Sequence, residues 1–143
     1  MNAIRATLQP SLDGSIHLPL RAELSLLDDF HPIAIYLFGS LSRGTGHRDS
    51  DIDLAFLPDC PCDPVEVFDK ANQLAEKLGR HVDLVDLRRA STVMRKEVLR
   101  SGILLQESDR NRRQEFEMMA FSDYARLNEE RQPVLRKLAL SIP

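Results

Sequence analysis

The segment LFGSLSRGTGHRDSDIDL, residues 37–54, joins a glycine-rich turn to a row of aspartates. It begins as an apolar strand, passes three glycines and then places Asp49, Asp51 and Asp53 at every second position. Residues two apart in a strand project to the same face, so Asp51 and Asp53 stand side by side where the next strand begins. Two adjacent carboxylates repel each other unless a cation lies between them. The segment therefore predicts a cation site beside a turn.

The glycines of this segment do not match three common ligand-binding motifs. A phosphate-binding P-loop requires lysine where Thr45 stands, and a dinucleotide fingerprint requires a third glycine where Asp49 stands. A calcium loop that starts at Asp49 would need glycine at position 54, which is Leu54, and glutamate at position 60, which is Cys60. We therefore exclude all three motifs.

The residue types of the segment suit a nucleotide bound with metal ions. Oxygen-only ligands favour Mg²⁺ or Mn²⁺. Gly39 lets the backbone approach an anion closely, and Ser40 offers a hydroxyl and an N–H at the start of a helical turn, where phosphate binds. A third carboxylate would suit a pair of ions, and HVDLVDL, residues 81–87, offers Asp83 and Asp86. These two face opposite ways, so only one can join the cluster, and strand parity alone leaves the choice open.

The rest of the chain predicts a sheet with helices packed on it. We expect strands at residues 33–38, 52–57, 81–87 and 103–106, and helices at residues 20–30, 64–78, 92–101 and from residue 108 onward. Residues 1 to about 18 predict a loose lead-in, and Pro133 predicts a break or kink in the last helix. The predicted fold class is α/β in the broad sense (α+β), a mixed β-sheet of about four strands flanked by helices, with a C-terminal helical tail.

The helix predicted at residues 64–78 has the clearest boundary signals. Asp63 is a good N-cap, Pro64 suits the first helical position, and Gly79 can adopt the left-handed conformation that ends a helix. The preceding helix is expected to end at His31-Pro32, because proline disfavours helical geometry in the residue before it.

Length and composition predict one domain without a membrane anchor. The chain has 143 residues, of which 43% are hydrophobic, and a formal net charge of −3. We expect a single domain over residues 1–143, with a core at about 20–106 and a helical tail at 108–143. The net charge gives no broad attraction to nucleic acid or anionic membrane, so direct DNA binding is not expected. The chain has no signal-peptide pattern and no run of 18 apolar residues, so we expect a cytoplasmic protein.

The two cysteines predict a reduced loop. Cys60 and Cys62 lie too close together for a disulfide framework and would supply only half of a zinc site. No histidine follows them at ligand spacing, because His81 stands alone after a predicted helix.

The spacing around the turn resembles a known signature. Gly39-Ser40, ten further residues and Asp51-Ile-Asp53 resemble the G-S-x10-D-x-D pattern of the DNA polymerase beta-like nucleotidyltransferase superfamily. Together, LFGSLSRG, SDIDLAF and VDLVDL resemble its minimal nucleotidyltransferase (MNT) branch, over about residues 20–106. The resemblance implies the polymerase beta-like nucleotidyltransferase fold.

The resemblance also implies a mechanism and its residues. It implies a catalytic, metal-binding triad, formed by Asp51, Asp53 and Asp83. It implies a second group that holds the triphosphate, formed by Gly39, Ser40 and Arg43. Two Mg²⁺ ions, or Mn²⁺, would support in-line attack on the α-phosphate of a nucleotide such as ATP, with release of pyrophosphate. Asp83 would position one ion and favour deprotonation of the acceptor hydroxyl.

MNT proteins of this size resemble the antitoxins of HEPN–MNT toxin–antitoxin pairs. There the MNT protein transfers AMP from ATP to a tyrosine of its partner, a HEPN RNase, and silences it. The resemblance therefore implies a HEPN-type RNase toxin as partner in a hetero-oligomer. The stripe of Phe116, Met119, Ala120, Tyr124 and Leu127 would then be partly core and partly a partner surface.

Two other functions remain open at this point. The chain could be a binding antitoxin that only occludes its partner, or a transferase that acts on a small molecule or an RNA end. We predict structural roles for several other residues. Asp49 and His47 are expected to be solvated loop residues, Asp86 a partly exposed strand residue, and Tyr36 and Tyr124 packing residues.

Overall fold

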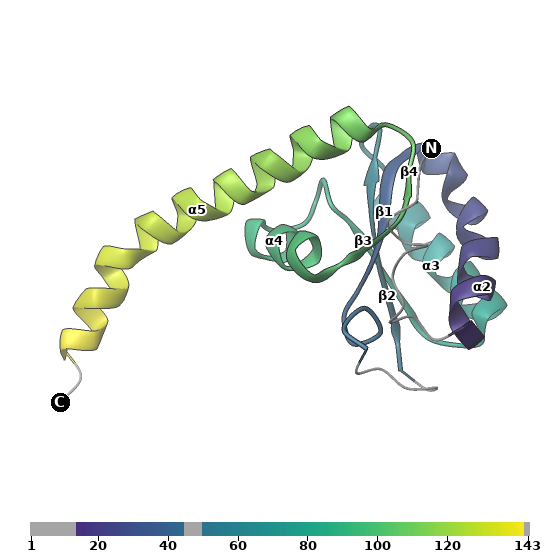
Figure 1. Ribbon diagram of the computed structural model, residues 1–143, viewed down its shortest axis with the longest axis horizontal. Helices are drawn as coiled ribbons and strands as arrows, with labels where there is room; N and C mark the ends of the chain where they lie inside the picture. Colours follow the sequence, from purple (N-terminus) through teal and green to yellow (C-terminus); the bar gives the residue numbers. More distant parts are fainter. Residues whose placement is uncertain (1–13, 45–49, 142–143) are drawn as a thin grey trace.

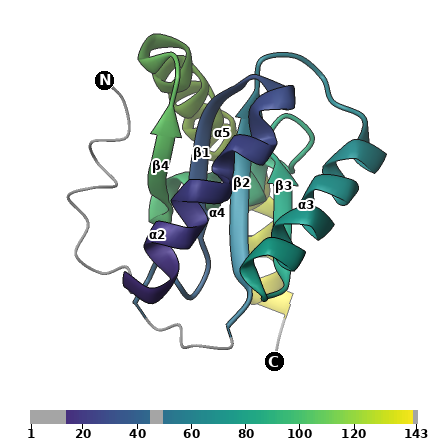
Figure 2. The same ribbon diagram turned by 90° about the vertical axis from the view of Figure 1, so that its right-hand side faces the viewer.

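A four-stranded mixed sheet forms the centre of the protein (Figure 1, Figure 2). The computed structural model describes residues 14–44 and 50–141. The elements in chain order are α2 (Gly14–Glu23), the 3₁₀ helix η1 (Leu24–Phe30), β1 (Pro32–Phe38), β2 (Ile52–Pro58), α3 (Pro64–Leu78), β3 (Val82–Asp86), α4 (Thr92–Ser101), β4 (Ile103–Glu107) and α5 (Arg110–Ser141). The predicted fold class, a mixed sheet of four strands with flanking helices and a C-terminal helix, is confirmed.

The strand order brings three strand ends to one edge of the sheet. The order is β3-β2-β1-β4, with β1 antiparallel to both β2 and β4, and β2 parallel to β3. Phe38, the last residue of β1, therefore lies opposite Asp53, near the start of β2. Because β3 runs parallel to β2, it begins at the same edge. The glycine turn after β1 and the first residues of β2 and β3 are thus neighbours.

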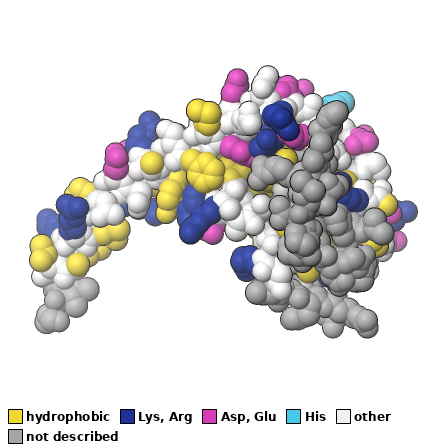
Figure 3. Space-filling model, in the orientation of Figure 1, with side chains coloured by type: hydrophobic (Ala, Val, Ile, Leu, Met, Phe, Trp, Pro, Cys, Tyr) yellow, Lys and Arg dark blue, Asp and Glu magenta, His cyan; other side chains and the backbone are white. Residues whose placement is uncertain are grey.

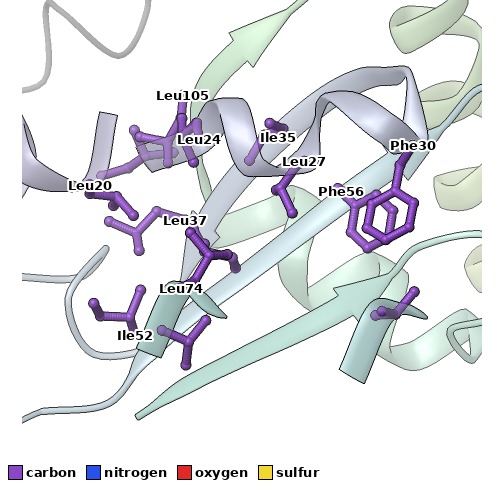
Figure 4. Packing of buried hydrophobic residues seen from close by; sticks show 14 of the residues in the cluster. Leu20, Leu24, Leu27, Phe30, Ile35, Leu37, Ile52, Phe56, Leu74 and Leu105 are labelled. Atoms are coloured by element: carbon purple, nitrogen blue, oxygen red, sulfur yellow. The ribbon is translucent and has the colours of Figure 1, made fainter. Parts of the chain in front are cut away.

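Helices cover both faces of the sheet (Figure 2). One face packs against α2, η1 and α3 in a core that Figure 4 shows at close range, with the rings of Phe30 and Phe56 stacked at a centroid distance of 5.0 Å. The other face packs against Val98 of α4 and Phe116 of α5. Along β2 the side chains alternate between the two cores, and Asp53 has the parity of Ala55 on the α4–α5 side. Strand alternation therefore directs Asp53 to that side.

The N-terminal helices differ from the prediction. Helix α2 already begins at Gly14, so the loose lead-in expected up to about residue 18 is wrong for residues 14–18, and Pro19 lies inside the helix. The second half, Leu24–Phe30, is a 3₁₀ helix. Its buried residues are Leu24, Leu27 and Phe30. They are spaced by three, and a 3₁₀ helix has three residues per turn, so this form directs all three into the core. Packing has overridden local propensity.

The predicted helix boundaries are confirmed at His31 and around α3. His31 has a positive φ of 47° and its N–H donates to the carbonyl of Asp28, which ends η1 before β1. The side chain of Asp63 accepts the N–H of Val65 at 2.9 Å. Gly79 closes α3 in the left-handed region, with φ of 67°.

Helix α5 continues through Pro133 for its full 32 residues, so the predicted break is wrong. Proline removes one helical hydrogen bond, and the leucine, lysine and arginine residues around it favour a helix. Phe116 and Ala120 are buried, which confirms the core part of the predicted stripe. Residues 128–140 are all exposed, and this part of α5, the projecting arm (residues 128–141), extends away from the sheet (Figure 1).

No helix among the described residues combines the length and the hydrophobicity needed to cross a bilayer.

Candidate active site

The glycine turn packs directly against a carboxylate. Gly39 follows β1 with a φ of +76°, a left-handed conformation that glycine adopts without strain. A Cβ atom on Gly39 would lie 2.1 Å from Oδ2 of Asp53, so no other residue fits here without displacing Asp53. The chain then makes a helical turn, in which the N–H of Arg43 donates to the carbonyl of Ser40 at 3.2 Å and the hydroxyl of Ser42 donates to that of Gly39 at 2.8 Å. The turn is the kind of feature that binds phosphate.

Four polar side chains form two rungs across the parallel strands β2 and β3. Asp53 lies beside Asp83 in the strand register. The N–H of Ile52 donates to the carbonyl of His81 at 2.9 Å, which places Asp51 beside His81 one rung earlier. Positions 51 and 53 share one face of the sheet, as do positions 81 and 83, and neighbouring strands are about 4.8 Å apart. Three carboxylates and one imidazole therefore meet at this corner.

Three of these side chains are close enough to share one cation. Asp51, His81 and Asp83 each offer a ligand atom, and these atoms lie within 4.8 Å of one another. Nε2 of His81 is 3.0 Å from Oδ1 of Asp83. All three side chains are exposed, whereas Asp53 is half-buried behind them, against the glycine turn. An ion can thus reach the cluster from solvent.

The electrostatics of Asp53 show that this corner has unbalanced negative charge. Burial raises the pKa of Asp53 to about 6, helped by a hydrogen bond with Asp83 and by the charges of Asp83 and Asp51, and only His81 opposes the shift. A divalent cation beside the three carboxylates would reverse it. The donor set of carboxylate oxygens, with a glycine cradle that holds Asp53 in place, fits such a cation.

Comparison with known proteins agrees with this geometry. The family described as Polymerase beta, Nucleotidyltransferase matches residues 25–111, which include the turn and all four polar side chains. The chain belongs to this nucleotidyltransferase family. The resemblance inferred from the G-S-x10-D-x-D spacing is confirmed.

Relatives of this nucleotidyltransferase come from toxin–antitoxin systems. Protein adenylyltransferase MntA of Shewanella oneidensis is 43% identical over 104 residues, which cover 71% of this chain and 72% of the relative. A chain in a crystal structure of a toxin–antitoxin with AMP-PNP is 38% identical, with a TM-score of 0.74, over 83% of this chain and 98% of that one. A chain in a complex of tri-AMPylated S. oneidensis HEPN toxin with MNT antitoxin is 35% identical, with a TM-score of 0.70, over 85% of this chain and 97% of that one.

The structure brings Asp83, and not Asp86, to the aspartate pair of the nucleotidyltransferase. Asp86 lies opposite Phe56 in the register, on the α3 side of the sheet. The prediction that it is partly exposed is wrong, because only 7% of Asp86 is accessible. Its Oδ1 accepts the N–H of Arg88 at 2.9 Å, so the carboxylate is turned inward to hold the turn that follows β3. Asp86 is therefore a structural residue.

The other predicted residues are placed as follows. Ser40 is half-buried and Arg43 is exposed on the turn. The binding of phosphate by Ser40 and Arg43 stays a prediction. His47 and Asp49 lie outside the described residues.

Both tyrosines are packing residues, as predicted. Tyr36 is buried, and its hydroxyl donates to Oε2 of Glu117 at 2.8 Å. Tyr124 is half-buried beneath the ammonium group of Lys96, which lies 4.6 Å from the ring centroid.

His81 is the site residue that sequence analysis missed. His81 is distant in sequence from Cys60 and Cys62, so the spacing of the cysteines gives no indication that it binds a metal. The signal was its position two residues before Asp83 in an extended segment, which puts both side chains on one face of the sheet.

Proposed function

We propose that this protein is an adenylyltransferase that uses Mg²⁺ to transfer AMP from ATP to a tyrosine hydroxyl of a partner HEPN RNase toxin, and that it thereby acts as an antitoxin. The observation that carries the proposal is the corner where the Gly39 turn packs against Asp53, beside Asp51 and Asp83. A related structure contains AMP-PNP, which supports ATP as the donor. Another contains tri-AMPylated HEPN toxin, which supports the toxin as the acceptor. A relative is named protein adenylyltransferase, which supports the reaction.

The three aspartates would hold two divalent cations, Mg²⁺ or Mn²⁺. Asp51 and Asp83 can supply exposed oxygens, and Asp53 can supply an oxygen from its fixed place against Gly39. A pair of bound ions would neutralise charge on the attacking and leaving oxygens. Catalysis here then requires little beyond accurate positioning.

The turn would hold the β- and γ-phosphates of ATP. Gly39 allows the close approach of an anion, and Ser40 lies at the start of the helical turn, the end of a helix at which phosphate binds. Arg43 is exposed at the end of this turn and can add a positive charge. These residues lie at the same edge as the carboxylates, which fits a triphosphate that runs from the turn to the metal site.

The acceptor oxygen would then attack the α-phosphorus in line with the departing group. A bond forms between this oxygen and the α-phosphorus, the bond from that phosphorus to the bridging oxygen breaks, and pyrophosphate leaves with the bond electrons. Asp83, whose carboxylate is exposed, would position one ion and favour loss of the hydroxyl proton.

Helix α5 offers a surface for the partner. Phe116, Ala120, Leu127, Val134 and Leu138 repeat at spacings that place them on one face of a helix. The first two are buried against the sheet, whereas Val134 and Leu138 are 60% and 56% exposed on the projecting arm. Figure 3 shows hydrophobic side chains exposed along α5, between basic ones. We propose that the toxin binds this continuation of the core stripe.

The same surface favours a second candidate function, that of a binding antitoxin. The exposed stripe of the arm is separate from the carboxylates, so it could hold and occlude a toxin without any transfer. Both functions would operate in the cytoplasm, where ATP is abundant and where the two free cysteines, Cys60 and Cys62, would stay reduced.

Intact-mass spectrometry of the co-expressed toxin separates the two functions. The purified complex is incubated with Mg²⁺ and each nucleoside triphosphate in turn, and the double variant Asp51→Asn/Asp53→Asn serves as control. We expect ATP to add one or more AMP units to the toxin with the natural chain and none with the variant. If the mass stays unchanged while the toxin remains inhibited in a stable complex, the protein is a binding antitoxin.

A further inference from the structure

We propose that His81 is a direct ligand of one of the bound cations, so that this site binds Mn²⁺ and related transition metals in preference to Mg²⁺. The inference rests on the proposed function only in that the same carboxylates hold the metal. It adds a nitrogen donor to a set that sequence analysis had treated as oxygen only.

The backbone places His81 in the site independently of its side-chain contact. Its carbonyl accepts the N–H of Ile52 at 2.9 Å, which aligns His81 with Asp51 across the parallel strands. The next aligned pair is Asp53 and Asp83. The imidazole is therefore one corner of a four-residue square whose other corners are the three aspartates, and the sheet itself fixes its position.

The separation of the donor atoms fits metal ligation. Two ligands at right angles, each about 2.1 Å from an ion, are about 3.0 Å apart. Nε2 of His81 and Oδ1 of Asp83 are 3.0 Å apart. The third donor, on Asp51, lies within 4.8 Å of both, near the separation of about 4.2 Å that two opposite ligands of one ion have. A cation can therefore replace the hydrogen bond between His81 and Asp83 without a change in the backbone.

Both side chains are open to an incoming ion. The His81 and Asp83 side chains are 64% and 55% exposed, so neither has to leave a packed core to reach the metal. An imidazole nitrogen contributes more to binding of Mn²⁺, Co²⁺ and Zn²⁺ than to binding of Mg²⁺, which favours oxygen ligands. His81 should consequently shift the metal preference of this site towards Mn²⁺, whereas three carboxylates alone would suit both Mg²⁺ and Mn²⁺.

Electron spin-echo spectroscopy of bound Mn²⁺ tests the ligand directly. The full-length protein is loaded with Mn²⁺, without nucleotide and with a non-hydrolysable ATP analogue. We expect modulation from a directly bound ¹⁴N nucleus, which changes to that of ¹⁵N when histidine is ¹⁵N-labelled. His81→Ala should abolish this modulation, and His31→Asn, an exposed histidine at the opposite end of β1, should leave it unchanged.

Calorimetric titration gives the second readout. Loss of an outer-shell partner of a metal ligand typically costs 10–100-fold in affinity, so loss of a direct ligand in His81→Ala should weaken Mn²⁺ binding at least about tenfold. The affinity for Mg²⁺ should fall by less than about threefold, because magnesium gains little from nitrogen. The far-ultraviolet circular dichroism of each variant shows whether it is folded.

Two results would overturn the inference: no histidine-derived modulation in the natural protein, or equal losses of Mn²⁺ and Mg²⁺ affinity in His81→Ala. His81 would then only orient Asp83. Neither measurement uses the toxin or detects transfer. A failure of AMP transfer to the toxin would therefore contradict the proposed function while leaving this inference standing, and the reverse also holds.

Discussion

At the scale of single residues, the geometry of the site depends on the absence of a Cβ atom at position 39. Gly39 has no side chain, and this absence lets Asp53 occupy the space beside β1. The backbone of the turn and the carboxylate of Asp53 are therefore in contact, which would keep a bound triphosphate and the proposed cations next to each other. A substitution here acts on both parts of the site at once.

Gly39→Ala should impair metal binding as well as stability. The added Cβ meets Asp53 and also has to adopt a φ of +76°, a strain that costs about 1–3 kcal/mol. Gly79→Ala is a matched control, because Gly79 has a similar φ of +67° but open space around its Cβ. Thermal unfolding should show that both variants lose stability, and titration with Mn²⁺ should show weaker binding only in Gly39→Ala. Equal metal affinities in the two variants would show that the contact with Asp53 is unimportant.

The raised pKa of Asp53 predicts how the metal-free protein responds to pH. Because this pKa rises from 3.8 to about 6 on folding, the folded state holds the proton more tightly than the unfolded state. The free energy of unfolding therefore decreases as the pH rises from about 4 to above 6, where the folded state carries the charged form. In EDTA, the melting temperature of Asp53→Asn, measured relative to that of the natural protein, should increase from pH 5 to pH 7.5.

Asp69→Asn, at an exposed aspartate of α3, is the control and should track the natural protein at every pH. Mg²⁺ at neutral pH should raise the melting temperature of the natural protein more than that of Asp53→Asn. A difference between Asp53→Asn and the natural protein that stays constant with pH would contradict the assignment.

At the scale of secondary-structure elements, a buried ion-pair network attaches α5 to the sheet. Arg113 is 4% exposed and donates from Nε to Glu107 of β4 at 2.9 Å and from Nη1 to Glu117 at 2.8 Å. The hydroxyl of Tyr36 on β1 donates to the same Glu117. This network joins the first turns of α5 to two strands.

Arg113→Ala should destabilise the protein by about 3–5 kcal/mol, because it leaves the buried carboxylate of Glu107 with only the exposed and more distant Arg110, at 3.8 Å. Arg126→Ala is the comparison, since Arg126 pairs with Asp123 but its side chain is 69% exposed, and it should cost less than about 1 kcal/mol. Urea unfolding measures both. Equal midpoints for the two variants would mean that the network does not stabilise α5.

The elements that could be predicted from sequence are those whose ends are marked by local chemistry. Asp63 and Gly79 fix the ends of α3 through their own backbone and side-chain hydrogen bonds, so a short window of sequence suffices. Pro19 lies inside α2 and Pro133 does not break α5. Neither proline ends its helix, because contacts far away in the sequence and the flanking helix formers outweigh one lost hydrogen bond.

The site shows the same division. Gly39, Ser40, Asp51 and Asp53 follow from spacing within one segment, whereas the choice between Asp83 and Asp86 required the strand register. The position of His81 two residues before Asp83 gave their common face, but its place beside Asp51 required the alignment of β2 and β3. Parity gives the face of a strand on which a side chain lies, but not which neighbouring strand it meets.

At the scale of the whole molecule, the protein consists of a compact body and a projecting arm (Figure 1). Along residues 128–140 the helix makes its own hydrogen bonds but has no buried side chain. Residues 131–141 also carry three basic side chains and no acidic one, while the chain as a whole has a net charge of −3. The part of the arm beyond Glu129 and Glu130 would therefore suit a partner surface that is apolar and acidic.

Leu138→Asp should weaken the complex with the toxin by about tenfold or more, because it places a charge in the apolar stripe of the arm. Leu140→Asp is a matched control, since Leu140 is 88% exposed and two residues further along the helix it points to another face. Interferometry with the immobilised toxin measures both affinities, and the two variants should unfold at the same temperature as the natural protein. Equal affinities of the two variants would place the toxin elsewhere.

The order of strands in the sheet also bears on how the protein is made. The turn and its two aspartates leave the ribosome about thirty residues before Asp83, and β4, which completes the pairing of β1, follows only at residues 103–107. A nascent chain that stops before β3 carries only part of the cation site, and one that stops before β4 leaves an edge of β1 unpaired. The complete set of three aspartates therefore exists only after β3 has been synthesised, and the sheet around it is completed only by β4.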